Sequence, residues 1–231
     1  MASRLLAVSF ATHDPKGLAG FWAAMLGRDV VETTEGATLP GDETQIGLRF
    51  ARAPGADAGP NRMHLHLTST DHDDQQETVA RALELGGHHL DVGQLPEEEH
   101  VVLADPGGNA FCVIPPGNSF LAGCGFLGEV ACDGTREVGS FWSKVLDWPL
   151  VWDHDGETAI QSPRGGTKVA WGGPPVSAPV TPAGEWLDLS PADGDARTEI
   201  ERLVSLGATR VDENTLLDPG GNEFRLHAAE D

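Results

Sequence analysis

Two histidines alternate with apolar residues in the stretch Met63–Ser69, which reads Met-His-Leu-His-Leu-Thr-Ser. Successive side chains of a β-strand point to opposite faces, so His64 and His66 share one face while the apolar residues point toward a core. Two adjacent imidazoles can move protons at neutral pH or supply two ligands to a metal. The sequence therefore predicts catalytic roles for His64 and His66.

A third donor would be needed to complete a catalytic metal site. Cys112, in a strand expected over 109–115, is one candidate, and Glu43, Glu99 and His100 in neighbouring loops are others. A His/His/Cys set favours zinc. The simpler interpretation is that the imidazoles form hydrogen bonds on a polar wall and that Cys112 is a small buried hydrophobe. We expect no cofactor, with a divalent metal held by His64 as the alternative.

Another polar set lies on strands expected in the second half of the chain. Arg225 has Asp188 and Glu223 as candidate partners, because a buried guanidinium requires acceptors. Such a pair is either structural or orients the arginine toward a ligand carboxylate. Aromatic residues on the same strands could stack on a flat ligand or belong to the core. The residues predicted to contact a ligand are Cys112, Trp171, Trp186, Asp188, Glu223 and Arg225.

The elements that must position these residues are written twice in the chain. Phe21-Trp22 recurs as Phe141-Trp142, and the five residues 105–109, Asp-Pro-Gly-Gly-Asn, recur identically at 218–222. Self-similarity at a fixed period indicates tandem copies of one domain. We predict two domains, residues 1–117 and 119–231.

Each half reads twice as a strand, a helix and about three strands. The first helix should begin at Asp14-Pro15 and end at Gly27, and the second should be capped by Asp73 or Asp74. The Asp-Pro-Gly-Gly-Asn segments lie between strands and are typical of tight hairpin turns. Connectors rich in glycine and proline, 53–60 and 172–184, join the units within each half.

These repeated motifs, with the strand beginning His-Leu-x-Leu, resemble the vicinal oxygen chelate superfamily. That superfamily includes glyoxalase I, extradiol dioxygenases and the fosfomycin- and bleomycin-resistance proteins. The resemblance implies an α+β fold of two tandem domains, each of two βαβββ units that form a half-open barrel.

The resemblance also implies where metal ligands would lie, on the first and last strands of each unit. The corresponding positions are Ala7, Phe50, His64 and Cys112 in the first half and Leu127, Ala170, Trp186 and Arg225 in the second. Metal sites of this superfamily use imidazole and carboxylate donors, and few of these positions carry them. The sequence therefore predicts that neither half holds the usual metal site.

Composition excludes several classes of partner. The net charge is −21, which disfavours nucleic acid and anionic membranes. Three cysteines at irregular spacing and the lack of a signal-like N-terminus predict a cytoplasmic protein. The fused repeat is consistent with a monomer or a homodimer.

Taken together, these features predict a protein that binds a small organic molecule in a barrel cavity, as bleomycin-resistance proteins do. The alternative is an enzyme of the glyoxalase or lyase, isomerase or dioxygenase type. It would use His64 and His66 with or without a divalent metal.

Overall fold

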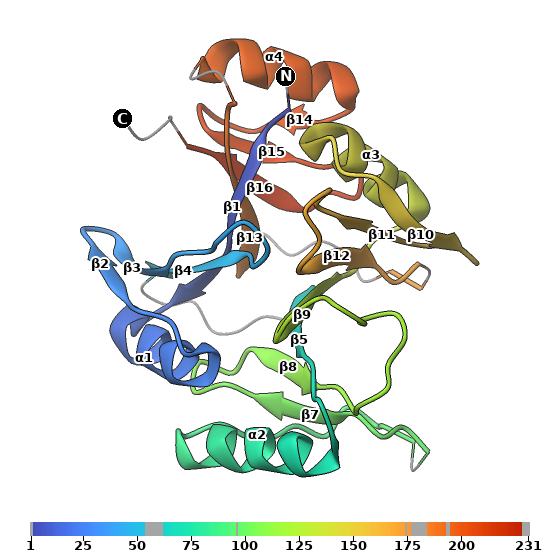
Figure 1. The fold of residues 1–231 in the computed structure, drawn as a ribbon. Coiled ribbons are helices and arrows are strands. Elements are labelled where there is room, and N and C mark those ends of the chain that lie inside the picture. Colours follow the sequence, from blue (N-terminus) through green and yellow to red (C-terminus); the bar gives the residue numbers. More distant parts are fainter. Residues whose placement is uncertain are drawn as a thin grey trace.

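Four βαβββ units follow one another along the chain (Figure 1). The computed structural model describes residues 2–53, 62–95, 97–173, 175–176, 184–192 and 195–227, so the two predicted connectors lie largely outside the described residues. Unit 1 consists of β1 (Arg4–Thr12), α1 (Pro15–Leu26), β2 (Val31–Thr33), β3 (Gly36–Leu39) and β4 (Gly47–Arg52). Unit 2 consists of β5 (Met63–Leu67), α2 (His72–Glu84), β6 (His88–His89), β7 (Val101–Ala104) and β8 (Ala110–Val113).

The second half repeats this order of elements. Unit 3 consists of β9 (Leu127–Cys132), α3 (Arg136–Leu146), β10 (Leu150–His154), β11 (Glu157–Gln161) and β12 (Lys168–Trp171). Unit 4 consists of β13 (Glu185–Ser190), α4 (Ala196–Leu206), β14 (Thr209–Arg210), β15 (Thr215–Leu217) and β16 (Glu223–Leu226). The predicted α+β class and the tandem organisation are confirmed.

The strands form two eight-stranded sheets, each joined at its centre by an antiparallel pair. Sheet A has the order β14-β15-β16-β13-β1-β4-β3-β2, and sheet B has the order β10-β11-β12-β9-β5-β8-β7-β6. Sheet A therefore joins unit 1 to unit 4, and sheet B joins unit 2 to unit 3. The expectation that the two units of one half share a barrel is wrong: each sheet takes one unit from each half of the repeat.

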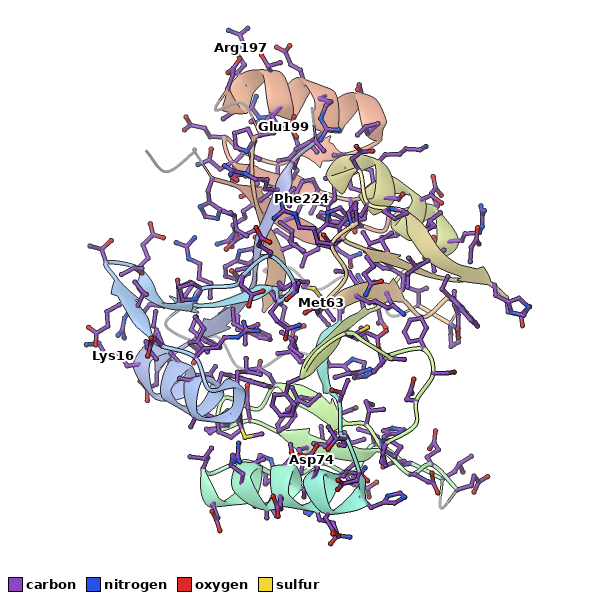
Figure 2. The ribbon with its side chains drawn as sticks, viewed as in Figure 1. Lys16, Met63, Asp74, Arg197, Glu199 and Phe224 are labelled. Carbon is purple, nitrogen blue, oxygen red and sulfur yellow. The ribbon has the colours of Figure 1, made fainter. Side chains whose placement is uncertain are left out.

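Helices α1 and α3 lie between the two sheets, whereas α2 and α4 lie at opposite ends of the molecule (Figure 1). Helix α1 packs on β3 and β4 of sheet A, and its Phe21 and Trp22 also contact Phe111 of sheet B at ring distances of 6.0 and 5.1 Å. Helix α3 packs on β11 and β12 of sheet B, and its Trp142 contacts Phe224 of sheet A at a ring distance of 5.1 Å. Phe224 is labelled in Figure 2. One apolar core thus joins both sheets.

The repeated motifs meet across this core. The indole Nε1 of Trp22 donates to Asp105 Oδ2 at 2.9 Å, and that of Trp142 donates to Asp218 Oδ2 at 3.1 Å. The other oxygen of Asp105 accepts from the backbone N–H groups of Gly107 and Asn109, both at 2.9 Å, which closes the hairpin turn. Burial raises the pKa of Asp105 despite these hydrogen bonds. The predicted tight turns are confirmed, and each one also links the two sheets.

Helix boundaries follow their capping residues. The Asp14 side chain accepts from the Gly17 N–H, and Gly27 ends α1 with φ of 64°. Helix α2 is capped by Asp71, whose side chain accepts from the Asp74 N–H at 2.9 Å, so the predicted cap at Asp73 or Asp74 is wrong. Asp74 in turn accepts from the backbone N–H of Thr70, the residue before the cap. Within the described ranges, no helix is long and apolar enough to cross a membrane.

Candidate functional site

The side chains of His64 and His66 lie on the face of sheet B that no helix covers, which we call the helix-free face. Between them, Leu65 is buried in the core at 1% exposure, as strand alternation predicts. The two imidazole rings are half-buried neighbours with centroids 4.8 Å apart. The predicted orientation of both histidines is confirmed.

Cys112 is the third donor at this place. It lies on β8 directly opposite His66 on β5, and its side chain is buried. The donor atoms of His64, His66 and Cys112 all lie within 4.8 Å of one another. Glu43, another candidate donor, is exposed and paired with Arg164 at 2.5 Å.

Sequence reasoning missed a carboxylate that completes the cluster. Glu129 of β9 faces His66 across the antiparallel β5–β9 pair, and its Oε2 lies 2.5 Å from His66 Nδ1. Only 7% of Glu129 is exposed. Because β9 belongs to unit 3, the cluster is assembled from both halves of the chain.

The two imidazoles have opposite pKa shifts. Burial and the neighbouring His66 lower the pKa of His64 to about 4. Burial also disfavours the charged form of His66, but hydrogen bonds to Cys112 and Glu129 outweigh it and raise that pKa to about 9. At neutral pH His64 is therefore an uncharged proton acceptor, and His66 is a cation paired with Glu129.

A small apolar cluster surrounds Cys112, made of Val102, Cys112, Ile114, Leu121 and Cys124. Leu121 and Cys124 belong to the segment between the two halves, so that segment packs on the helix-free face of sheet B. The Lys168 ammonium, on β12 opposite Glu129, donates to the Phe120 carbonyl and lies 4.3 Å from the centre of its ring. These contacts hold the segment against the sheet.

A cavity of about 440 Å³ continues this face beyond His66. It lies between the end of β5 and the same inter-half segment, next to the imidazole pair rather than over it. Its walls include Thr68, Ser69, Ile114, Leu121 and Phe126. Ile114 and Leu121 are shared with the apolar cluster around Cys112, so the cavity and the polar cluster adjoin.

The corresponding face of sheet A carries a closed network around Asp188. This carboxylate is 1% exposed and accepts from the Ser9 hydroxyl, from Trp186 Nε1 at 2.8 Å and from His227 Nε2 at 2.8 Å. Arg49 lies 3.6 Å away. Burial opposes ionisation of Asp188, but His227, Ser9 and Arg49 outweigh it and lower the pKa.

Arg225 pairs with Glu223, not with Asp188. Its Nε and Nη2 donate to Glu223 Oε1 at 2.9 and 2.7 Å. The guanidinium carbon lies 3.6 Å from the centre of the Trp186 ring, a cation–π contact. Glu223, Arg225, Trp186 and Asp188 thus share one face as predicted, and their contacts are with one another.

Three side chains that the sequence analysis assigned to a ligand or metal site point into the core instead of toward the helix-free faces. Trp171 is buried at 2% exposure and stacks on Trp142 in the core, so it cannot contact a ligand on the helix-free face. Phe50 and Leu127 are also core residues. The register of the β5–β9 pair shifts between His66 and Leu67, opposite Gly128, which turns Leu127 inward and leaves Glu129 outward.

The two faces differ in their fit to a metal ion. On sheet A, Asp188 is occupied by its own partners, and Ala7, Trp186 and Arg225 offer no donor, so a metal does not fit the described residues. On sheet B, His64, His66 and Cys112 fit a three-ligand zinc set. Glu129 would orient His66 from outside that set, as carboxylates do for metal-bound histidines.

Comparison with known proteins agrees with this architecture. The family model of the glyoxalase-like domain matches residues 7–114 and 129–227. Maize (Zea mays) glyoxalase I, as its V278E mutant, is 15% identical over 97% of this chain and 92% of its own, with a TM-score of 0.68. A Bacillus subtilis structure is 12% identical over 96% and 84%, with a TM-score of 0.58. A search of curated protein sequences gave no match. The chain belongs to the glyoxalase-like domain family.

Proposed function

We propose that the helix-free face of sheet B binds a small organic molecule without the family's usual metal site. The observation that carries this proposal is the polar cluster of His64, His66, Cys112 and Glu129 beside a cavity of about 440 Å³. Ligand sites of this size combine apolar walls with a few convergent polar groups. The apolar walls come from the cluster around Cys112.

The charge states define the kind of ligand. A protonated His66 would keep Glu129 on Nδ1 and exchange its hydrogen bond with Cys112 for one to a carbonyl or carboxylate oxygen, and a neutral His64 can accept from a hydroxyl. A ligand with a carbonyl or vicinal oxygens therefore matches this pair.

A second candidate, metal-free acid–base catalysis, is favoured by pKa values that fall on either side of neutrality. Environments that separate two pKa values in this way assign one group as the acid and the other as the base. His64 would take a proton from the carbon next to a carbonyl, and His66 would protonate the carbonyl oxygen to give an enol. Return of a proton to the neighbouring carbon would complete an isomerisation.

The zinc arrangement is the third possibility to be tested. His64, His66 and Cys112 would hold the ion, and a zinc ion supplies a Lewis acid that polarises a carbonyl oxygen. Glu129 would keep the His66 ring oriented.

Native mass spectrometry of protein purified without chelators or a nickel column separates these candidates. We expect a bound small molecule in the wild type and in His13→Ala, an exposed-histidine control, and its loss in His66→Phe. One equivalent of zinc lost in His64→Ala would support the metal site instead. A wild type that carries no small molecule, and that none of the small carbonyl compounds added to it binds, would contradict the proposal.

Turnover is tested by proton exchange in deuterium oxide. If His64 is a base, the methyl protons of added methyl pyruvate exchange faster with enzyme than without it, as followed by nuclear magnetic resonance. The exchange should survive a chelator and be lost in His64→Ala, while His13→Ala leaves it unchanged. Binding without exchange would support the binding protein alone.

A further inference from the structure

Arg62, immediately before β5, is a buried cation without hydrogen-bonded partners for its side chain. Only 11% of the side chain is exposed, and all three guanidinium nitrogens are buried without a hydrogen bond within the described ranges. Asp133 Oδ2 lies 3.8 Å from Nε, close enough for charge attraction and too far for a hydrogen bond. The five N–H groups of the guanidinium therefore make no hydrogen bond to the described part of the chain.

This arrangement is costly for a residue with only a structural role. A buried guanidinium normally has its donors paired, since leaving them unpaired forfeits their hydration. The main chain at Arg62 has its own hydrogen-bond partners, so it does not explain why the side chain is left without any. Glu185 Oε2 accepts from the N–H groups of Arg62 and Met63 at 3.1 and 2.9 Å, which fixes the main chain beneath the side chain.

Arg62 continues the row of His64 and His66. Residues two apart on an extended chain point to the same face, with about 6.6 Å between them. The Arg62 carbonyl accepts from the Asp133 N–H at 2.7 Å, so the β5–β9 pairing extends to this position. The Asp133 carboxylate is also among the charges that act on the His64 pKa, so Asp133 lies within electrostatic range of that imidazole.

The net charge of the protein bears on what the Arg62 guanidinium could bind. With a net charge of −21, the protein repels anions at long range, so an anionic ligand requires local cations. The helix-free face of sheet B offers the Arg62 guanidinium in one row with the imidazoles of His64 and His66. The planar guanidinium matches a carboxylate or phosphate in a bidentate manner.

We propose that Arg62 binds the anionic group of a small carbonyl compound whose oxygen-bearing end contacts His64 and His66. This inference rests on the proposed binding of a small organic molecule on the same face. It narrows the class of ligand to oxo compounds that carry a carboxylate or phosphate. That anionic group would lie at Arg62, two residues before His64 on the extended chain.

The first test uses the ligand-free protein. Arg62→Met removes a buried charge that has no hydrogen bond and keeps a long unbranched side chain, so its melting temperature in chloride buffer should equal or exceed that of the wild type. Inorganic phosphate should raise the melting temperature of the wild type and of the control Arg136→Met, but not that of Arg62→Met. A fall of several degrees in ligand-free Arg62→Met would assign Arg62 a structural role and overturn the proposal.

The second test compares pyruvate with methyl pyruvate by calorimetric titration. The wild type should bind the acid more tightly, and Arg62→Met should weaken the acid about 10- to 100-fold while leaving the ester unchanged. His66→Phe should weaken both. Equal weakening of acid and ester by Arg62→Met, or no preference for the acid in the wild type, would overturn the role of Arg62 and leave binding on this face intact. A wild type that binds neither pyruvate nor phosphate would also overturn it.

Discussion

The helix-free faces of sheets A and B are built from equivalent strands and have opposite chemistry. On sheet A, the buried Asp188 accepts hydrogen bonds from Ser9, Trp186 and His227 and lies 3.6 Å from Arg49, so its partners come from within the protein. On sheet B, an uncharged His64 lies beside a protonated His66, and Arg62 has no acceptor. The comparison teaches that one barrel face is held closed by its own ion pairs, while the other retains groups that a ligand can satisfy.

The largest effect on stability should come from disrupting the Asp188 network on sheet A. Asp188→Asn removes the carboxylate that His227, Ser9 and Trp186 share and leaves Glu35 as the carboxylate partner of Arg49, and we expect the free energy of unfolding to fall by about 3–5 kcal/mol. Urea denaturation measures this. The control Asp153→Asn, at an exposed pair with Arg136, should change stability little. If Asp188→Asn costs no more than the control, the face of sheet A is not held by this network.

The free energy of unfolding should depend on pH through the two histidines on the helix-free face of sheet B. The pKa of His66 is raised from its ordinary value near 6.5 to about 9, so its contribution is complete below pH 6.5 and is lost as the pH rises through 9. The expected loss is about 3 kcal/mol of unfolding free energy. His64, with a pKa lowered to about 4, loses its contribution as the pH falls from 6.5 through 4.

If only the contributions of His64 and His66 are considered, chelator-treated protein should be most stable near pH 6.5. In Glu129→Gln the decline between pH 6.5 and 9 should shrink, because the carboxylate that favours protonated His66 is gone. Urea titrations at several pH values test this. An unchanged alkaline decline in Glu129→Gln would show that another group causes it.

The smallest effect should come from the two hydrogen bonds between tryptophan and aspartate. We expect them to stabilise the two halves of the chain equally, unlike the two helix-free faces. Trp22→Phe and Trp142→Phe each remove one hydrogen bond to a buried aspartate of the hairpin turn. We expect each to lower the unfolding free energy by about 1–2 kcal/mol. Tyrosine is absent from the chain, so the remaining tryptophans report unfolding by fluorescence. A cost in only one variant would mean that the two links are not equivalent.

Much of the fold could be predicted from the sequence because its landmarks have local physical causes. Asp14-Pro15 and Gly27 bound α1, and the two Asp-Pro-Gly-Gly-Asn segments form hairpin turns, because capping and turn formation depend on neighbouring residues. Strand alternation placed His64 and His66 on the correct face for the same reason.

The pairing of units could not be predicted in this way. Either partner offers β1 or β5 an equivalent central strand, so the pattern of residues along one strand does not choose between them. Glu129 was missed because the position that the resemblance assigns on this strand is Leu127, and the irregularity at Gly128 reverses the face. Trp171 was misplaced because the short strand Lys168–Trp171 gives too few residues to set its alternation.

The crossed pairing of units has a consequence for how the two faces could come to differ. Two separate copies of a half-length chain, arranged in this way, would be related by a twofold axis, and any substitution would occur in both barrels at once. Covalent fusion through the segment 115–126 removes that constraint. One barrel is then free to become a rigid ion-paired support while the other keeps the chemistry.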